Sequence, residues 1–255
     1  MPTKYIAIII TILIAIIFFN IDSTTKKGVD YSINEENINL YVKINDFYKR
    51  HKIYLALNKK IFDENTISDN FLILSRWIYK NIDKLEKNDQ IIDDHPSSIL
   101  LRKKGANDQF NDILSILLVY SGYEAFYKNL EYFNSSYPLT FVKIDDYWTV
   151  IDPYNGFYFL NSEKKFASIN DFKKNNYIIK KLNNDYTFKS NEKIFFFGNN
   201  VKISEVNKQI NSIFNKFDPQ KEIYKKHKYL RGGRSYFQDP FNRVHYILLK
   251  FFRLI

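Results

Sequence analysis

The sequence predicts an α+β fold in which a helix packs on an antiparallel sheet, behind an apolar N-terminal helix. Three observations support this fold class: an unbroken apolar run near the amino terminus, apolar residues at helical spacing up to about residue 122, and short aromatic runs after it. An amphipathic helix packed on an antiparallel sheet is the simplest assembly of these pieces. The 255 residues are 45% hydrophobic, which is enough for one substantial core.

Composition limits the classes of function. The chain is basic, with 38 Lys and Arg against 28 Asp and Glu, which favours acidic partners such as anionic lipid or acidic polysaccharide. None of the usual nucleic-acid-binding motifs accompanies this charge, so we expect no nucleic-acid partner. The sequence contains no cysteine, which excludes disulfides, thiolate metal sites and thiol nucleophiles. We expect no cofactor.

Residues 5–21 form the apolar run, in which Thr11 and Asn20 are the clearly polar members. Its length is at the short end for a membrane-spanning helix. No small-x-small cleavage site follows, which disfavours a cleaved signal peptide, and a buried core helix is the third alternative. We therefore expect residues 1–21 to be a membrane anchor or an uncleaved signal. This implies a single-pass membrane protein with an extracytoplasmic domain, although the flanking charges specify the orientation only weakly.

Residues 22–62 combine a polar tether with an N-terminal helical region of mixed spacing. A clearer helix covers residues 68–82, where apolar residues share one face and Ser68 is a suitable N-cap. A second helix follows Asn107 and stops at Gly122. It is apolar around much of its circumference, so we expect it to be buried. Asn107 is either the N-cap of this helix or a ligand-binding residue at its head.

Beyond Gly122 the apolar pattern changes from helical spacing to short aromatic and β-branched runs. The predicted strands are residues 123–128, 137–144, 147–152 and 157–160. Asp145 and Asp146 join the second and third strands as a hairpin. The sequence "DPYNG" supplies the turn before the fourth strand.

Residues 176–255 form a basic C-terminal region. An amphipathic helix is expected from Ser204, and "KIFFFG" at 193–198 has the composition of a strand. In residues 241–255 basic side chains surround an apolar face. This terminal segment either lies on a membrane surface, as a second contact besides the anchor at 5–21, or docks on the core of the domain.

The order of these features resembles the transglutaminase-like superfamily, a group of α+β enzymes related to the cysteine proteases. The resemblance covers residues 63–175, and it includes the helix at 68–82 and the helix that follows Asn107. Its most specific part is the last hairpin, because the spacing of four residues there needs no gap. These residues are Trp148, Asp152, Pro153 and Gly156.

The resemblance implies a Cys at the start of the buried helix, a His on the following strand and an Asp on the next. These positions fall on Asn107, Tyr137 and Asp152, so one of the three residues is retained. A carboxamide is not a nucleophile, and a phenol with a pKa near about 10 is a poor base at neutral pH. The degenerate triad and Asp108 are therefore candidates for ligand binding. The predicted function is a membrane-anchored, catalytically inactive binding or scaffold module for a protein or an acidic glycan.

Two other functions stay open. In the first, a hydrolase uses Asp108 or Asp152 to activate water, which requires an open pocket and a carboxylate of raised pKa. In the second, the chain is a purely structural protein without a concave site. We expect no metal site at residues 93–95, "DDH", because three adjacent loop residues cannot encircle an ion and no second ligand cluster is visible.

Overall fold

The computed structural model describes residues 3–29, 32–63, 70–86, 89, 93–132, 135–196, 199–215, 217–219 and 221. The helices in these residues are α1 (Thr3–Phe19), α2 (Leu40–Asp63), α3 (Asn70–Asn81), α4 (Pro96–Arg102), α5 (Asn107–Tyr120), α6 (Ile169–Lys173) and α7 (Ile203–Asn215). The strands of the main sheet are β5 (Ala125–Tyr132), β6 (Ser135–Ile144), β7 (Tyr147–Asp152), β8 (Phe157–Leu160) and β9 (Ile178–Lys181). Three two-stranded pairs complete the elements: β1 (Asp22–Val29) with β2 (Ser32–Asn39), β3 (Asp83–Lys84) with β4 (Lys104–Gly105), and β10 (Lys193–Phe196) with β11 (Asn199–Lys202).

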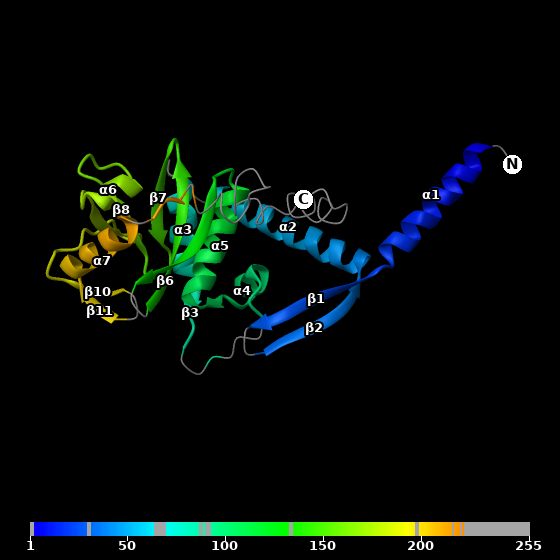
Figure 1. Ribbon diagram of the computed structural model, residues 1–255, viewed down its shortest axis with the longest axis horizontal. Helices are drawn as coiled ribbons and strands as arrows, with labels where there is room; N and C mark the ends of the chain where they lie inside the picture. The colour runs from blue at the N-terminus through cyan, green and yellow to red at the C-terminus, as the bar shows by residue number, and fades with distance from the viewer. Residues whose placement is uncertain are drawn as a thin grey trace.

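The described part of the chain is a mixed α+β structure built on one five-stranded antiparallel sheet. The strands follow one another in the order β5-β6-β7-β8-β9, so each pairs with its neighbour in sequence. Helix α5 contacts β5 and β6, whereas α6 and α7 contact β7 and β5 from the opposite side (Figure 1). The predicted strands at 147–152 and 157–160 coincide with β7 and β8.

Side chains alternate between the two faces of the sheet, and each face has its own core. On the face toward α6 and α7, Phe141 and Val150 are paired across β6 and β7 and are at most 1% exposed. On the face toward α5, the next pair of residues, Val142 and Thr149, is equally buried. The sheet is therefore covered on both sides.

Helix α5 is buried, as its apolar circumference predicts. Phe110, Ile113, Leu114 and Leu117 are each at most 1% exposed. The helix ends at Tyr120, and Gly122 follows with a positive φ of 89°, a conformation that a side chain would disfavour. The interior position of α5 fixes where its first turn lies relative to β6.

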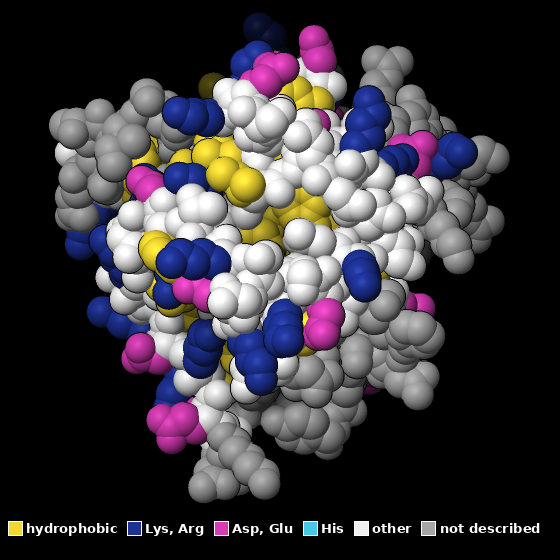
Figure 2. Space-filling view, turned by 90° about the vertical axis from the view of Figure 1, so that its left-hand side faces the viewer, with side chains coloured by type: hydrophobic (Ala, Val, Ile, Leu, Met, Phe, Trp, Pro, Cys, Tyr) yellow, Lys and Arg dark blue, Asp and Glu magenta, His cyan; other side chains and the backbone are white. Residues whose placement is uncertain are grey.

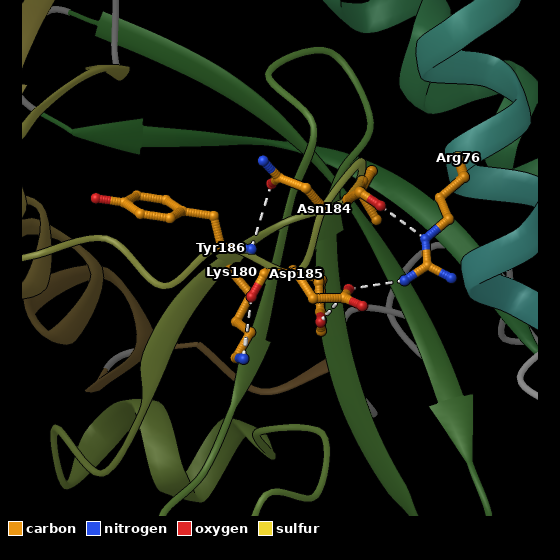
Figure 3. A network of polar contacts seen from close by, with 7 residues as sticks. Arg76, Lys180, Asn184, Asp185 and Tyr186 are labelled. Carbon is orange, nitrogen blue, oxygen red and sulfur yellow. Dashed lines mark hydrogen bonds and ion pairs between the residues drawn. The ribbon is translucent and has the colours of Figure 1, made fainter.

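A polar network ties α3 to the far edge of the sheet (Figure 3). The Arg76 Nε atom donates to the Leu182 carbonyl oxygen at 2.7 Å, and Arg76 Nη2 lies 2.8 Å from Asp185 Oδ1. The Tyr158 hydroxyl donates to the same carboxylate at 2.8 Å. Asp185 sits in the turn after β9 with a φ of 53°, so this short turn is held from two sides.

The predicted membrane anchor is wrong. Within the described ranges, no helix combines the length and apolarity that a bilayer crossing requires, and this also overturns the single-pass localisation and the transmembrane part of the predicted fold class. The apolar run extends to Ile21, but α1 has 17 residues and ends at Phe19. The Asn20 Nδ2 atom donates to the Ile16 carbonyl oxygen at 2.8 Å, which supplies a partner for a carbonyl of the last turn. At about 1.5 Å per residue the helix is about 25 Å long, against about 30 Å of hydrocarbon.

Several sequence predictions fall on residues outside the described part of the chain. They are the N-cap Ser68 and the terminal segment 241–255. The helix expected from Ser204 corresponds to α7, which begins one residue earlier.

Candidate functional site

The head of α5 is held by a short parallel pairing of β3 with β4, which places Lys84 beside Gly105. The helix begins at Asn107, and its N-cap is Ala106 in an extended conformation (φ −81°, ψ 171°). The Ala106 amide donates to Gln109 Oε1 at 3.0 Å, so a side chain from inside the first turn takes the amide of the N-cap residue. The prediction that Asn107 caps the helix is therefore wrong.

Asn107 is linked to the sheet through one intermediate residue. Asn111 Nδ2 donates to the Asn107 carbonyl oxygen at 2.8 Å and to Asn107 Oδ1 at 3.1 Å. The Thr140 hydroxyl donates to Asn111 Oδ1 at 2.9 Å and lies on the α5 face of β6. Tyr137 is three residues before Thr140, so its side chain leaves the opposite face of this strand.

Tyr137 and Asp152 form a buried polar pair within the sheet. Their side chains are 2% and 0% exposed, and the Tyr137 hydroxyl donates to Asp152 Oδ2. Asn155, in the turn after β7, completes the cluster: its amide nitrogen donates to Asp152 Oδ1 at 3.0 Å. Its Nδ2 atom donates to Asp152 Oδ2 at 3.0 Å and to the Tyr137 hydroxyl oxygen. Three donors thus surround one carboxylate.

Burial raises the pKa values of both Tyr137 and Asp152. Burial raises the pKa of Asp152 above its usual range, and the hydrogen bonds from Tyr137 and Asn155 offset part of that rise. Burial and the neighbouring Asp152 carboxylate raise the pKa of Tyr137 well above its usual value. Tyr137 is therefore a neutral hydrogen-bond donor and not a base.

Lys84 and Tyr154 lie over the same cluster. The Lys84 Nζ atom is 4.2 Å from the centroid of the Tyr154 ring and 3.4 Å from Asn155 Oδ1. Desolvation lowers the pKa of Lys84, and the attraction of Asp152 offsets part of this. The Tyr154 ring also meets the Phe110 ring of α5 edge-on at 5.1 Å, so it contacts both Lys84 and the first turn of the helix.

The structure thus brings together two of the four predicted site residues. Tyr137 and Asp152 are in contact, whereas the hydrogen bond of the Asn107 side chain within the described residues is with Asn111. Asp108 is exposed on the first turn of α5, where its Oδ1 accepts from the Gln109 amide at 3.0 Å. The sequence reasoning missed two other groups, Lys84 and Asn155. The "DPYNG" turn is the only signal that could have indicated Asn155.

The residues at 93–95 form hydrogen bonds with the first turns of α4 and α5. His95 is the N-cap of α4, and its Nδ1 atom accepts from the Ser97 amide. Asp93 accepts from the Ser98 hydroxyl and Asp94 from Gln109 Nε2, each at 2.5 Å. No group of three His, Asp or Glu side chains suited to a metal ion occurs in the part of the chain that the structure describes.

A separate part of the chain, which follows β8, is rich in lysine. Residues 161–221 contain twelve lysines against six acidic residues. Figure 2 faces the end that carries α6 and α7, and Lys and Arg side chains are spread across it. Two of these lysines, Lys193 and Lys202, lie directly opposite each other on β10 and β11. Like charges in such cross-strand pairs repel each other, so this pair is unfavourable without an anion beside it.

Comparison with known proteins found no match to the chain. No family model, no curated protein and no solved structure matches it. The transglutaminase-like core and the degenerate enzyme predicted from the sequence thus have no support from known proteins. The resemblance itself stays a prediction.

Proposed function

We propose that this chain is a non-catalytic binding protein that recognises an acidic glycan through the lysine-rich end that carries α6, α7 and the β10–β11 pair. The observation that carries the proposal is a set of exposed lysines at that end that have no acidic partner among the residues that the structure describes. Lys193, Lys202 and Lys208 are exposed, and none of them forms an ion pair with another described residue. An uncompensated array of this kind attracts a polyanion.

The buried pair supports the non-catalytic part of the proposal. A hydrolase of the predicted kind needs a carboxylate that can reach water and substrate. Asp152 has no exposed surface, and its oxygens are already engaged by Tyr137 and Asn155. Asp108 is exposed on the surface of α5, so it lacks the enclosure that such chemistry requires.

Binding is tested on the full chain with a soluble polyuronate and, as the neutral control, dextran. We expect the polyuronate to bind, the affinity to fall as salt is added, and dextran not to bind. The triple variant Lys193→Glu, Lys202→Glu, Lys208→Glu should lose binding. The matched control Lys49→Glu, Lys52→Glu, Lys59→Glu makes the same charge change at exposed positions of α2 and should keep most of it.

Three results would contradict the proposal. The first is the absence of polyuronate binding, and the second is an equal loss of binding in both triple variants. The third is enzymatic: incorporation of an amine into a glutamine peptide, or hydrolysis of that peptide, at a rate that Asp152→Asn abolishes. We expect both reactions to stay at the level of the protein-free blank.

A further inference from the structure

A pocket of about 320 Å³ lies between the start of β7, helix α6 and the residues that follow α7. Its walls include the aromatic side chains of Tyr147, Trp148 and Phe217, together with three polar groups on Asp146, Asn170 and Lys173. The volume is at the small end of ligand sites and suits a molecule the size of one sugar ring. The pocket belongs to the lysine-rich end and is separate from the Tyr137–Asp152 pair.

The aromatic wall is fixed by the core beneath it. Trp148 is 8% exposed and meets Phe126 edge-on at 5.3 Å, while the Phe217 ring lies 4.9 Å from Phe141. These contacts hold the rings in place before any ligand arrives. The C–H groups on one face of a sugar ring carry partial positive charge and are attracted by the negative face of an aromatic ring.

The three polar groups are available to a ligand. The Asp146 carboxylate, the Asn170 amide and the Lys173 ammonium make no side-chain hydrogen bond or ion pair with the described residues. Ser168, which also lines the pocket, is already engaged, because its hydroxyl donates to Asp171 Oδ2 at 2.7 Å in the cap of α6. An ammonium, a carboxylate and an amide from separate positions thus remain unpaired around one small space.

We infer that this pocket binds a single uronate residue, and the inference rests on the proposed function in naming that residue as part of the acidic glycan. The Lys173 ammonium pairs with the carboxylate of the sugar. Asn170 both donates and accepts, and Asp146 accepts, which matches the hydroxyl groups of the ring. Asp146 and Asp218 also line the pocket, so the charge of the lining is mixed and Lys173 is the residue placed to pair with the sugar carboxylate.

The two tryptophans of the chain provide the measurement. The full chain is labelled with 5-fluorotryptophan, and Trp77→Phe identifies which of the two fluorine signals belongs to Trp148. Glucuronate is then titrated, with glucose as the matched sugar that lacks the carboxylate. We expect saturable movement of the Trp148 signal with glucuronate, no movement of the Trp77 signal, and an affinity for glucose lower by about tenfold or more.

Lys173→Gln should weaken glucuronate binding by about tenfold, because it removes the charge that pairs with the carboxylate. Lys174→Gln is the control, since this exposed neighbour does not line the pocket. The inference is overturned if the Trp148 signal does not move, if glucose binds as well as glucuronate, or if the two variants behave alike. Polyuronate binding without movement of Trp148 overturns the pocket but not the proposed function. Movement of Trp148 by glucuronate without polyuronate binding overturns only the proposed function.

Discussion

Asp152 and Asp185 each accept a hydrogen bond from a tyrosine hydroxyl, but their surroundings differ. Asp152 is fully buried and receives its bond from Tyr137. Asp185 has a side chain that is 57% exposed, and it pairs with Arg76 as well as with the Tyr158 hydroxyl. The first carboxylate depends on fixed donors because water cannot reach it, whereas water can replace the partners of the second. Matched changes at the two sites should therefore differ in size.

The largest effect is expected for Asp152→Ala, which removes the carboxylate that accepts from the Tyr137 hydroxyl and from two Asn155 nitrogens. We expect a loss of about 3 to 5 kcal/mol in the free energy of unfolding, because the enclosed cluster loses the acceptor that its hydrogen bonds share and a cavity replaces the carboxylate. Asp185→Ala is the control and should cost about 1 kcal/mol or less. Urea unfolding measures both losses. Losses of equal size would show that the burial of Asp152 does not increase its contribution to the free energy of unfolding.

Tyr137→Phe removes one hydroxyl from the same cluster and keeps the ring. We expect a loss of about 2 kcal/mol, because the buried Asp152 carboxylate keeps Asn155 as a donor but loses its hydroxyl partner. Tyr158→Phe removes the corresponding hydroxyl at Asp185 and should cost about 1 kcal/mol or less. A larger loss for Tyr158→Phe in the same unfolding assay would reverse the comparison.

The pH dependence of stability isolates the charge of Asp152. Burial raises its pKa, so the native chain keeps a proton at pH values where the unfolded chain has lost it. The stability that this group contributes is fully present below the unfolded pKa of about 3.9 and is lost as the pH rises toward the folded value. The unfolding free energy of the wild type minus that of Asp152→Asn should therefore fall with rising pH, by at most about 1.4 kcal/mol per unit.

Unfolding titrations of both proteins from about pH 4 to pH 7 give this difference directly. A difference that rises with pH would mean that the hydrogen bonds from Tyr137 and Asn155 outweigh burial. Asp185→Asn serves as the reference for an exposed carboxylate.

The local pattern of apolar and polar residues was sufficient to predict most strands of the sheet and helix α5. Strands β7 and β8 are short runs of apolar and aromatic residues between turn residues, and such patterns can be recognised within a few residues of sequence. Strand β9 was not predicted, because "IIKK" is short and pairs with β8 across an intervening helix. The apolar run at the amino terminus predicted a helix correctly but gave no account of its end, which depends on Asn20.

The candidate site was harder to predict, for reasons of geometry. Tyr137 and Asp152 were both named by the resemblance to the transglutaminase-like superfamily, and the structure brings them into contact. The resemblance could not show that Asn107 is tied to Thr140 on the other face, since that depends on how α5 lies on the sheet. Lys84 reaches the cluster through a two-residue parallel pairing that leaves no pattern in the sequence.

A similarly small effect is expected for the arginine that pairs with the exposed aspartate of the comparison. Arg76→Ala removes an ion pair with a largely exposed partner and a hydrogen bond to the Leu182 carbonyl oxygen. Screening by water limits the ion pair, so the loss in unfolding free energy should be about 1 kcal/mol or less, and most of it should persist at high salt because it comes from the carbonyl. Asp185→Asn keeps the arginine in place and separates the two contributions. If Arg76→Ala costs as much as Asp152→Ala, the network in Figure 3 supports the fold as strongly as the buried pair, and exposure is not what distinguishes the two aspartates.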